Sequence, residues 1–469
     1  MSARCGTPAA PRLFMYDLPD SYRHGGLLQD AVRRNRIDTR WGVGNVSTIR
    51  LPAHLFVGLN DLGQLHWRKG NYWTSAAFYR RAQDYACSTH DAEQADLFFV
   101  PVFNDSPAPE PCESPCRDAV RALKNRSAAA AVQQRCARDS LFHRLQGLGG
   151  DRSGGSFMET HASRHILHSP RHAEKDVPSQ MMPCGTHEFS LEDARLQPMT
   201  RLAVEALTPT PLQGIRHSAG FRSVPSLSYV HAAPTTRWHD LPWRRRPARG
   251  LLVAAAFIVK QMTSKRTGML AIRSALARAC GRRNHSCALT TFAKADHYSG
   301  ELPAAAALRT LSMYWNATFC MHPVGDACVR TGVIDSLLLG CIPVVFHRCQ
   351  LEQWAWHWGD WAAHATLFFD AEEVISGAVD PVAELQRVPA ARVAKMRRVI
   401  AEHAHCLHYR RPTQSEVAKH RAPVGAAGMV GTAADAFDIT LEATLWHATH
   451  PQARESPTFC VRVPWPKIK

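Results

Sequence analysis

The sequence predicts an α/β fold, because apolar runs of strand length alternate with helical patterns and because one strand–helix–strand unit is clear. That unit lies between Thr318 and Arg348. Its first part, Thr318 to His322, is an apolar run of strand length, and Cys341 to Phe346 has the composition of a buried strand. The helix between them carries apolar residues along one stripe, at Val333, Ile334, Leu337 and Leu338. The unit is therefore half of a parallel βαβ arrangement.

The turn of this unit suits an anion. Pro323 and Gly325 break the strand pattern, and Asp326 is a good N-cap for a helix that we expect to begin near Ala327. A helix N-terminus offers backbone N–H groups and a positive dipole end, and Arg330 adds a cation. These features favour a nucleotide-phosphate site. The alternative is that Asp326 simply caps an ordinary helix of an α/β protein.

The other elements follow the same alternation. A helix is predicted over Tyr72 to Ser88, followed by a strand over Leu97 to Val102, whereas Gly147 to Ser190 is expected to form long loops. Beyond this stretch, Leu251 to Val259 predicts a buried strand and Thr267 to Cys280 a helix. We therefore predict an N-terminal Rossmann-like domain over 1–236 with an irregular insert at about 147–220, a linker over 237–250, and a C-terminal domain over 251–469 whose last helix crosses back.

Composition indicates a globular protein with an anionic partner. The chain has 469 residues, 45% of them hydrophobic and 20% charged, and a net charge of +16. Nucleic acid is the rival partner, yet no zinc finger, aromatic RNA-binding motif or helix-turn-helix stands out, so we expect no nucleic-acid binding. The basic run from Trp243 to Arg249 is interpreted as solvated surface or linker charge.

Signals for the cellular compartment conflict. No apolar stretch of membrane-spanning length and no hydrophobic N-terminal signal occur, which taken literally indicates a soluble cytosolic chain. Against this, five N-x-S/T sequons and 14 cysteines are present. Cys112 and Cys116, in a Pro-rich loop, suggest a lumenal disulfide, since zinc would need further ligands at suitable spacing. Four cysteines around the central unit are expected to act as small buried hydrophobes, namely Cys320, Cys328, Cys341 and Cys349.

The central unit also carries a family resemblance. The string HPVGD, an Arg four residues after its Asp, and the run DSLLLGCIPVVF together resemble the signature of the exostosin glycosyltransferase family. Further similar segments are LFMYDLPDSY (13–22), HDAEQADLFFVPVF (90–103), QWAWHWGDW (353–361) and AADAFDITLEATL (433–445). Two stretches depart from the family pattern: 149–161, where a G-R-D-H-F block is usual, and most of 163–240.

The resemblance implies the glycosyltransferase-B plan, with two Rossmann-like domains facing a cleft. It further implies an inverting transfer from a UDP-sugar to a cell-wall or extracellular glycan acceptor, in the Golgi. Membrane association would then require an anchor missing from this chain, and a hetero-complex with another glycosyltransferase is a further expectation. The degraded block at 149–161 leaves a second interpretation open, a non-catalytic member that serves as a complex or folding partner.

Donor-binding candidates gather in the C-terminal half. Arg330 and Gly325 suit the diphosphate, and Arg273 is a second cation, because the family often has an I-R pair there. The remaining donor-binding candidates are Asp326, His322, Asp335 and Glu373. Each has a structural alternative: Asp326 as a helix cap, His322 as a hydrogen-bonded histidine, Asp335 as a brace and Glu373 as part of a solvated helix start. No D-x-D motif stands in a convincing context, so we expect no metal cofactor.

The general base that deprotonates the acceptor should come from the N-terminal half. Asp17 directly follows the first predicted strand, and Asp151 and His161 lie in or beside the departing block. Asp105 and Glu159 are further carboxylates in that half. The sequence does not choose among them.

Overall fold

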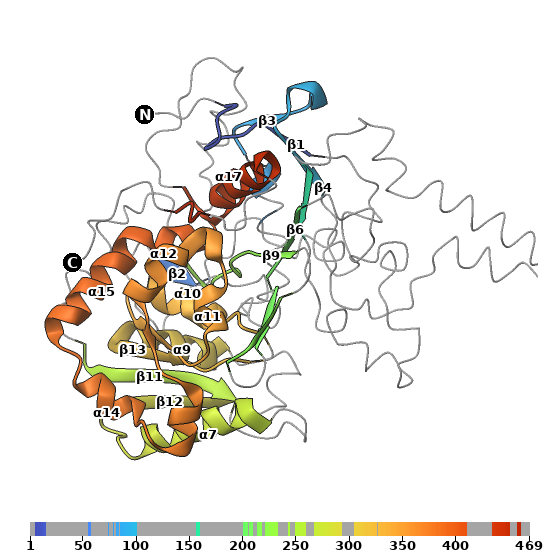
Figure 1. The fold of residues 1–469 in the computed structure, drawn as a ribbon. Helices are drawn as coiled ribbons and strands as arrows, with labels where there is room; N and C mark the ends of the chain where they lie inside the picture. Colours follow the sequence, from blue (N-terminus) through green and yellow to red (C-terminus); the bar gives the residue numbers. More distant parts are fainter. Residues whose placement is uncertain are drawn as a thin grey trace, which may run out of the picture.

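A computed structural model shows an α/β protein built on two parallel sheets (Figure 1). The residues that it describes are 5–15, 55–57, 74, 78, 81–83, 85–100, 156–159, 200–204, 206–209, 213–217, 221–232, 243, 249–258, 267–292, 304–325, 327–409, 434–450 and 457–460. The predicted fold class is confirmed by these sheets.

The first sheet is built from short parallel strands in the order β3-β1-β4-β5-β6-β9. The strands are β3 (Ser88–Thr89), β1 (Leu13–Met15), β4 (Leu97–Val100), β5 (Ser156–Glu159), β6 (Thr200–Ala203) and β9 (Phe221–Ser223). The expectation of irregular structure over about 147–220 is wrong for β5 and β6, which lie inside this sheet. Strands of four residues between Gly- and Ser-rich segments leave too little alternation to reveal them.

Two small antiparallel pairs accompany this sheet. One is the hairpin of β7 (Leu207–Pro209) and β8 (Ile215–His217). The other pairs β2 (Leu55–Val57) with β10 (Val230–Ala232), which are far apart in the sequence.

The second sheet has the order β12-β11-β13-β14-β15, and every neighbouring pair is parallel. Its strands are β11 (Leu251–Ile258), β12 (Cys287–Phe292), β13 (Ala317–His322), β14 (Ile342–Val345) and β15 (Leu367–Phe368). From β11 the chain goes first to one side, to β12, and then to the other, to β13. The strand order therefore reverses between β11 and β13, and ligands of open α/β sheets bind outside the carboxyl ends of the strands at such a point.

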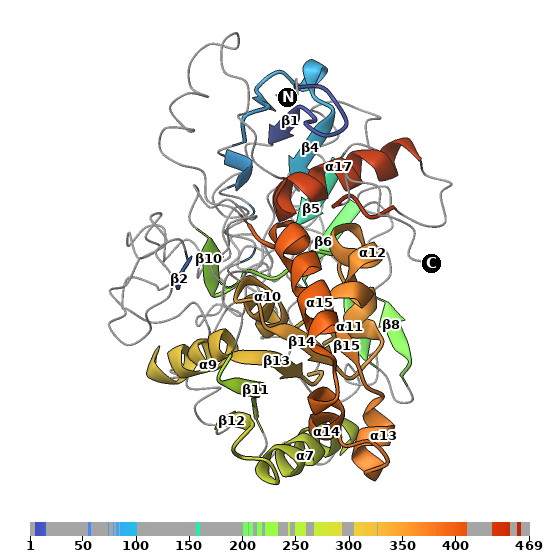
Figure 2. The ribbon, with the colours of Figure 1, turned by 90° about the vertical axis from the view of Figure 1, so that its left-hand side faces the viewer.

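Helices cover both faces of this sheet. Figures 1 and 2 show α9 (Ala304–Asn316) and α10 (Thr331–Leu338) on one side, and α7 (Thr267–Gly281) with α14 (Pro381–Gln386) on the other. The strand expected from Leu251 and the helix expected from Thr267 are confirmed. The helix expected near Ala327 instead begins at Thr331, with Arg330 at the N-cap position.

The last helix, α17 (Ala436–Thr449), packs against N-terminal residues (Figure 1). Asp435 and Asp438 form a capping box at its start, and both accept hydrogen bonds from Arg81, at 2.8 and 3.2 Å to Asp435 and 3.0 Å to Asp438. The rings of Phe78 and Tyr85 meet Phe437, with centroids 4.7 and 5.6 Å apart. The D-A-F-D sequence is therefore a helix cap and a buried ion pair.

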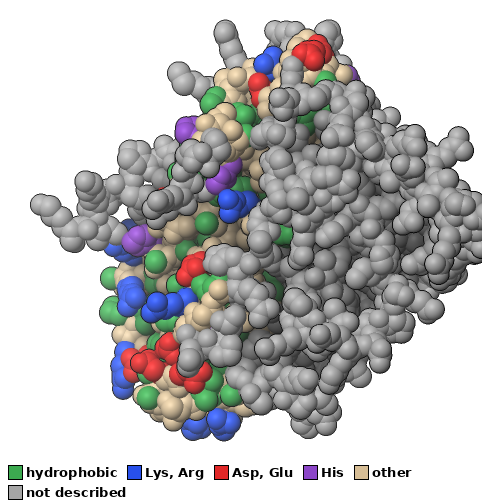
Figure 3. Space-filling view, turned by 45° about the vertical axis from the view of Figure 1, so that its right-hand side comes forward, with side chains coloured by type: hydrophobic (Ala, Val, Ile, Leu, Met, Phe, Trp, Pro, Cys, Tyr) green, Lys and Arg blue, Asp and Glu red, His purple; other side chains and the backbone are tan. Residues whose placement is uncertain are grey.

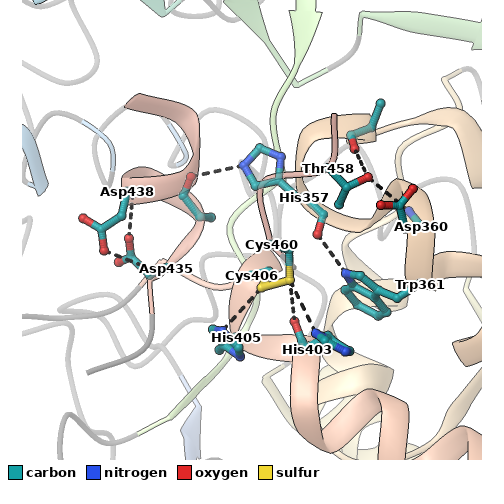
Figure 4. Close-up of a disulfide and its surroundings, with 12 residues drawn as sticks. His357, Asp360, Trp361, His403, His405, Cys406, Asp435, Asp438, Thr458 and Cys460 are labelled. Carbon is teal, nitrogen blue, oxygen red and sulfur yellow. Dashed lines mark hydrogen bonds between the residues drawn. A yellow bond between two sulfur atoms is a disulfide. The ribbon is translucent and has the colours of Figure 1, made fainter. Parts of the chain in front are cut away.

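A C-terminal segment is fastened onto α12 (Ala355–Ala365). Figure 4 shows the disulfide between Cys406 and Cys460, and Phe459 donates its backbone N–H to the carbonyl of Trp356 at 2.8 Å. The tryptophans of this region are at most 3% exposed, so they form core and offer no face for sugar stacking; they are Trp354, Trp356, Trp358 and Trp361.

Every cysteine in the described part of the chain is paired. The pairs are Cys5–Cys87, Cys280–Cys287, Cys320–Cys341, Cys328–Cys349 and Cys406–Cys460. The interpretation of the four central cysteines as unpaired hydrophobes is therefore wrong. They are indeed fully buried, but two adjacent parallel strands and the loops that follow them bring them together in pairs.

The predicted linker is packed where it is described. Trp243 is buried and donates its indole N–H to the carbonyl of Leu338 at 3.1 Å. Arg249 donates to the carbonyls of Tyr314, Trp315, Ala317 and Leu339 at 2.8 to 3.0 Å. The interpretation of this basic run as solvated charge is thus wrong for Arg249, whose side chain donates hydrogen bonds to these four backbone carbonyls.

No helix within the described ranges is long and apolar enough to cross a membrane.

Candidate functional site

The candidate site lies where the loop 323–330 leaves β13 and enters α10, at the carboxyl edge beside the strand-order reversal. Arg330, at the end of this loop, has extended backbone, and α10 starts only at Thr331. The first N–H groups of any helix lack intrahelical acceptors. The start of α10 therefore presents backbone donors and a positive dipole end at this edge of the sheet.

Arg330 lies across the loop. Its Nε donates to the carbonyl of Pro323 at 2.9 Å, and its side chain is half-buried. A Cβ placed on Gly325 would lie 2.9 Å from the Arg330 Cζ atom. Glycine is therefore what lets the guanidinium approach this backbone so closely. Arg330 and Gly325, predicted together as phosphate-binding residues, form one unit in the structure.

Arg273 holds the same loop from α7, on the opposite side of the sheet. It is 7% exposed, and its Nη2 donates to the carbonyl of Val324 at 3.0 Å. Two arginines thus fix successive carbonyls of one loop, those of Pro323 and Val324. Of the two, Arg330 is the more exposed, so Arg330 is the better placed to meet a ligand and Arg273 to support the loop.

His322 is a buried, neutral histidine. Its Nε2 lies 3.2 Å from the Ser336 hydroxyl, and its ring stands edge-on to Tyr314 at a centroid distance of 5.5 Å. Burial, together with the nearby charge of Arg330, lowers the pKa of His322 to about 3. A Cβ on Gly332 would lie 3.1 Å from its Cε1 atom, so the ring packs directly under the first turn of α10. This arrangement is that of a hydrogen-bonded structural histidine, the alternative role predicted for His322.

Asp335 braces α10 against an N-terminal segment. Its Oδ1 accepts hydrogen bonds from the Ser228 hydroxyl at 2.5 Å and from the backbone N–H groups of Tyr229 and Val230 at 2.8 and 3.2 Å. The carboxyl is 2% exposed, and burial raises its pKa to about 7 although these donors oppose the shift. Of the two roles predicted for Asp335, this geometry is that of the brace.

Glu373 lies in the first turn of α13 (Ala371–Ser376), after the carboxyl end of β15. It is exposed, and Asp370, not Glu373, caps the helix by accepting the Glu372 N–H at 2.8 Å. Acidic side chains gather at the lower end of the described surface, the end at which α14 lies (Figures 1 and 3). The position of Glu373 is therefore that of its structural alternative, an exposed residue at the start of a helix.

Five predicted residues lie outside the described part of the chain: Asp326 and the base candidates Asp17, Asp105, Asp151 and His161. The described strands nearest to the base candidates are β1, which ends at Met15, and β5, which ends at Glu159. The choice of base therefore stays a prediction.

Three features of the site were not predicted. The hairpin β7–β8 lies against the loop: Leu207 shares an apolar cluster with Val324, on which Ile215 packs, and the carbonyl of Leu207 accepts the Cys328 N–H at 3.2 Å. The Cys328–Cys349 disulfide crosses from this loop to the segment after β14. Gln350 then accepts the N–H groups of Phe346 and His347 and donates to the carbonyl of His322 at 2.9 Å. The equal spacing of two cysteine pairs was the available signal, since Cys320 and Cys328, like Cys341 and Cys349, are eight residues apart.

Within the described ranges no group of three or more His, Cys, Asp or Glu side chains is arranged to hold a metal ion.

An α/β protein with cationic side chains and a helix N-terminus at a strand-order reversal is of the class that binds phosphorylated ligands. Residues 181–363 match the family model described as Exostosin GT47 domain. This match spans the loop 323–330 and α10. The resemblance to the exostosin glycosyltransferase family is thereby confirmed over these residues.

Curated relatives from Arabidopsis thaliana, which are named as galactosyltransferases, agree with this family match. The probable xyloglucan galactosyltransferase GT17 is 24% identical over 442 residues, which is 92% of this chain and 81% of the relative. The xyloglucan galactosyltransferase XLT2 is 23% identical over 439 residues, 92% of this chain and 74% of the relative. The xyloglucan galactosyltransferase MUR3 is 29% identical over 147 residues, 31% of this chain and 22% of the relative.

Among solved structures, the UDP-forming α,α-trehalose-phosphate synthase from Burkholderia vietnamiensis is 9% identical and covers 75% of this chain and 98% of its own, with a TM-score of 0.32.

Proposed function

We propose that this protein transfers a sugar from a UDP-sugar to a cell-wall or extracellular glycan, with inversion at the anomeric carbon. The single observation that carries the proposal is that the oriented Arg330 side chain lies at the start of α10, at the strand-order reversal. The galactosyltransferase names of the relatives make UDP-galactose the first donor to test and a xyloglucan-type glycan the first acceptor.

The chemistry explains why such a unit is needed. As the bond from C1 of the sugar to the donor diphosphate breaks, negative charge grows on the leaving UDP. Preorganised cations and N–H dipoles stabilise that charge most where they need no rearrangement. The Arg330 guanidinium is already oriented by the Pro323 carbonyl, and its fork suits two phosphate oxygens. Arg273 supports this from behind by fixing Val324.

The acceptor hydroxyl must lose a proton as it attacks C1 from the face opposite to UDP. Asp17, Asp151 and His161 remain the proposed bases, and each is replaced in turn by Asn or Ala in the transfer assay. The true base variant should lose transfer while retaining UDP binding, because the base does not contact the nucleotide. Loss of both transfer and UDP binding in a variant would not identify the replaced residue as the base.

A lumenal location is part of the proposal. Paired cysteines are typical of oxidising compartments. The sequon residue Asn284 is exposed, in the turn closed by the Cys280–Cys287 disulfide. Expression in a secretory system should therefore give a glycan at Asn284, and peptide mass spectrometry before and after glycosidase treatment checks it. An unmodified Asn284 in secreted protein would contradict this part of the proposal.

Donor hydrolysis tests the function. The purified protein is incubated with UDP-galactose, UDP-xylose, UDP-glucuronate, UDP-arabinose and UDP-N-acetylglucosamine, and released UDP is measured against buffer. We expect slow release from one donor and faster release when its acceptor glycan is added. A thermal shift with each donor identifies binding independently of turnover. Release no faster than buffer from every donor, despite binding, would instead favour the non-catalytic partner.

A further inference from the structure

We propose that the Cys328–Cys349 disulfide positions the donor loop, so that Arg330 and the start of α10 are held ready for the diphosphate before it binds. The proposal rests on the proposed function for the identity of the ligand. It adds an element of the site that touches no substrate and acts through the loop 323–330.

The disulfide joins two neighbouring loops at the carboxyl edge of the sheet. Cys328 lies in the loop after β13, two residues before Arg330. Cys349 begins α11 (Cys349–Glu352), just after β14, and the two Cα atoms are 5.6 Å apart. The disulfide thus ties the loop that carries Arg330 to a segment that follows the adjacent strand.

The anchor on the Cys349 side is rigid. Gln350, which follows Cys349, accepts the backbone N–H groups of Phe346 and His347 at 3.1 and 3.2 Å. Its amide also donates to the carbonyl of His322 at 2.9 Å, at the end of β13. Gln350 and Cys349 are 0% exposed. The disulfide therefore ties the loop to a buried segment that the Gln350 hydrogen bonds hold in place.

The described residues of the loop lie in no helix or strand, and α10 begins only after Arg330. Hydrogen bonds to the carbonyls of Pro323 and Val324 help to hold these residues, as does the bond from the Cys328 N–H to the carbonyl of Leu207. The last of these comes from the hairpin β7–β8, whose Leu207 packs in the same apolar cluster as Cys328 and Cys349. A covalent tie is the strongest restraint in this set.

The chain contains a matched control. The Cys320–Cys341 disulfide joins the same two parts of the chain, and its sequence separation is 21 residues, as is that of Cys328–Cys349. All four cysteines are 0% exposed. Loop closure in the unfolded chain depends on that separation, so removal of either disulfide should lower stability similarly by this route. The two differ in place: Cys320–Cys341 lies within the sheet, between β13 and the entry to β14, away from Arg330.

The test compares C328A/C349A with C320A/C341A, both made by secretory expression and studied at a temperature where both are folded. UDP affinity is measured by calorimetry. We expect C328A/C349A to weaken UDP binding about tenfold or more, because the loop must then be ordered on binding, and C320A/C341A to change it less than about twofold. Equal losses in both variants, or no loss in C328A/C349A, would overturn the proposal.

Hydrogen exchange provides a second readout that needs no ligand. Amides of residues 324–330 should exchange faster in C328A/C349A than in wild type and in C320A/C341A, while those of β11 stay protected in all three. Unchanged exchange in the loop overturns the proposal even if UDP proves not to be the ligand. Wild type that fails to bind UDP while the loop responds as expected refutes the proposed function alone. Should the double alanine variant not fold, C328V/C349A restores apolar volume and gives the same comparison.

Discussion

Arg81 and Arg330 are two arginines that lie in segments resembling the exostosin family or contact such segments. Arg81 is buried and Arg330 is half-buried, and the two have different roles. Arg81 is 5% exposed and is bound by the carboxylates of Asp435 and Asp438. Arg330 is more exposed, is oriented by a backbone carbonyl and lies against the backbone of Gly325. A cation enclosed by carboxylates holds the fold together. Arg330 stands at the N-cap position of α10, where its charge adds to the positive end of the helix dipole.

The comparison predicts its largest effect at Arg81. Arg81→Met would leave Asp435 buried without its partner and should lower the free energy of unfolding by about 3 to 5 kcal/mol. Chemical denaturation followed by fluorescence measures this. The matched control is Arg387→Ala, which removes an exposed ion pair with Glu384 and should cost less than about 0.5 kcal/mol. Equal stability of the two variants would show that the Arg81 ion pair does not anchor α17.

A second prediction concerns the brace at Asp335. Its pKa is raised from 3.8 to about 7 by burial, so the folded protein binds this proton more tightly than the unfolded chain. The resulting stabilisation is complete below about pH 4 and is lost as the pH rises through 7. Relative to Asp335→Asn, wild type should lose on the order of 2 to 4 kcal/mol across that window.

Denaturation of both proteins at pH 4, 5, 6 and 7 checks this difference. Taking the difference between the two proteins removes the titration of all other groups. A difference that stays constant with pH would mean that the pKa of the buried carboxyl is ordinary, and a difference that grows in favour of wild type toward pH 7 would mean that its pKa is lowered on folding; either result contradicts the prediction.

The smallest predicted effect on stability, with a clear effect on binding, is at Gly325. The Cβ of Gly325→Ala would displace the Arg330 guanidinium, and UDP affinity should fall about tenfold, the lower part of the range for a hydrogen bond to a charged group. Gly281→Ala is the control, because a Cβ there meets nothing within 4 Å. Calorimetry on both variants decides. Unchanged affinity in Gly325→Ala would separate Arg330 from the binding site.

The sequence predicted the strands and the helix around the candidate site but not the long-range contacts that join them. Periodicity identified β13, the stripe of α10 and β14, because each buries a continuous apolar face. The predicted start of α10 near Ala327 is about four residues early, since Asp326 is a good cap in isolation. The described residues up to Arg330 are instead held outside the helix by contacts from α7, from the hairpin and from Cys349. Such long-range restraints leave no local pattern.

The same reason explains the other misses. Cys328 and Cys349 have the burial expected of hydrophobes, and only the adjacency of two strands reveals that they are bonded. Arg249 appears in a basic run typical of surface charge, yet tertiary structure brings four backbone carbonyls to it. Roles that depend on which segments meet in space, including the brace at Asp335, could be offered from sequence only as alternatives.

The most direct test of the central claim is a titration of UDP into wild type and Arg330→Ala by calorimetry, each with and without EDTA. The account predicts that Arg330→Ala weakens UDP binding by about 1.5 to 3 kcal/mol, the usual worth of a hydrogen bond to a charged group, and that EDTA changes neither affinity. Arg387→Ala should bind UDP like wild type. Equal affinities for wild type and Arg330→Ala, or loss of binding on chelation, would contradict the account of the site.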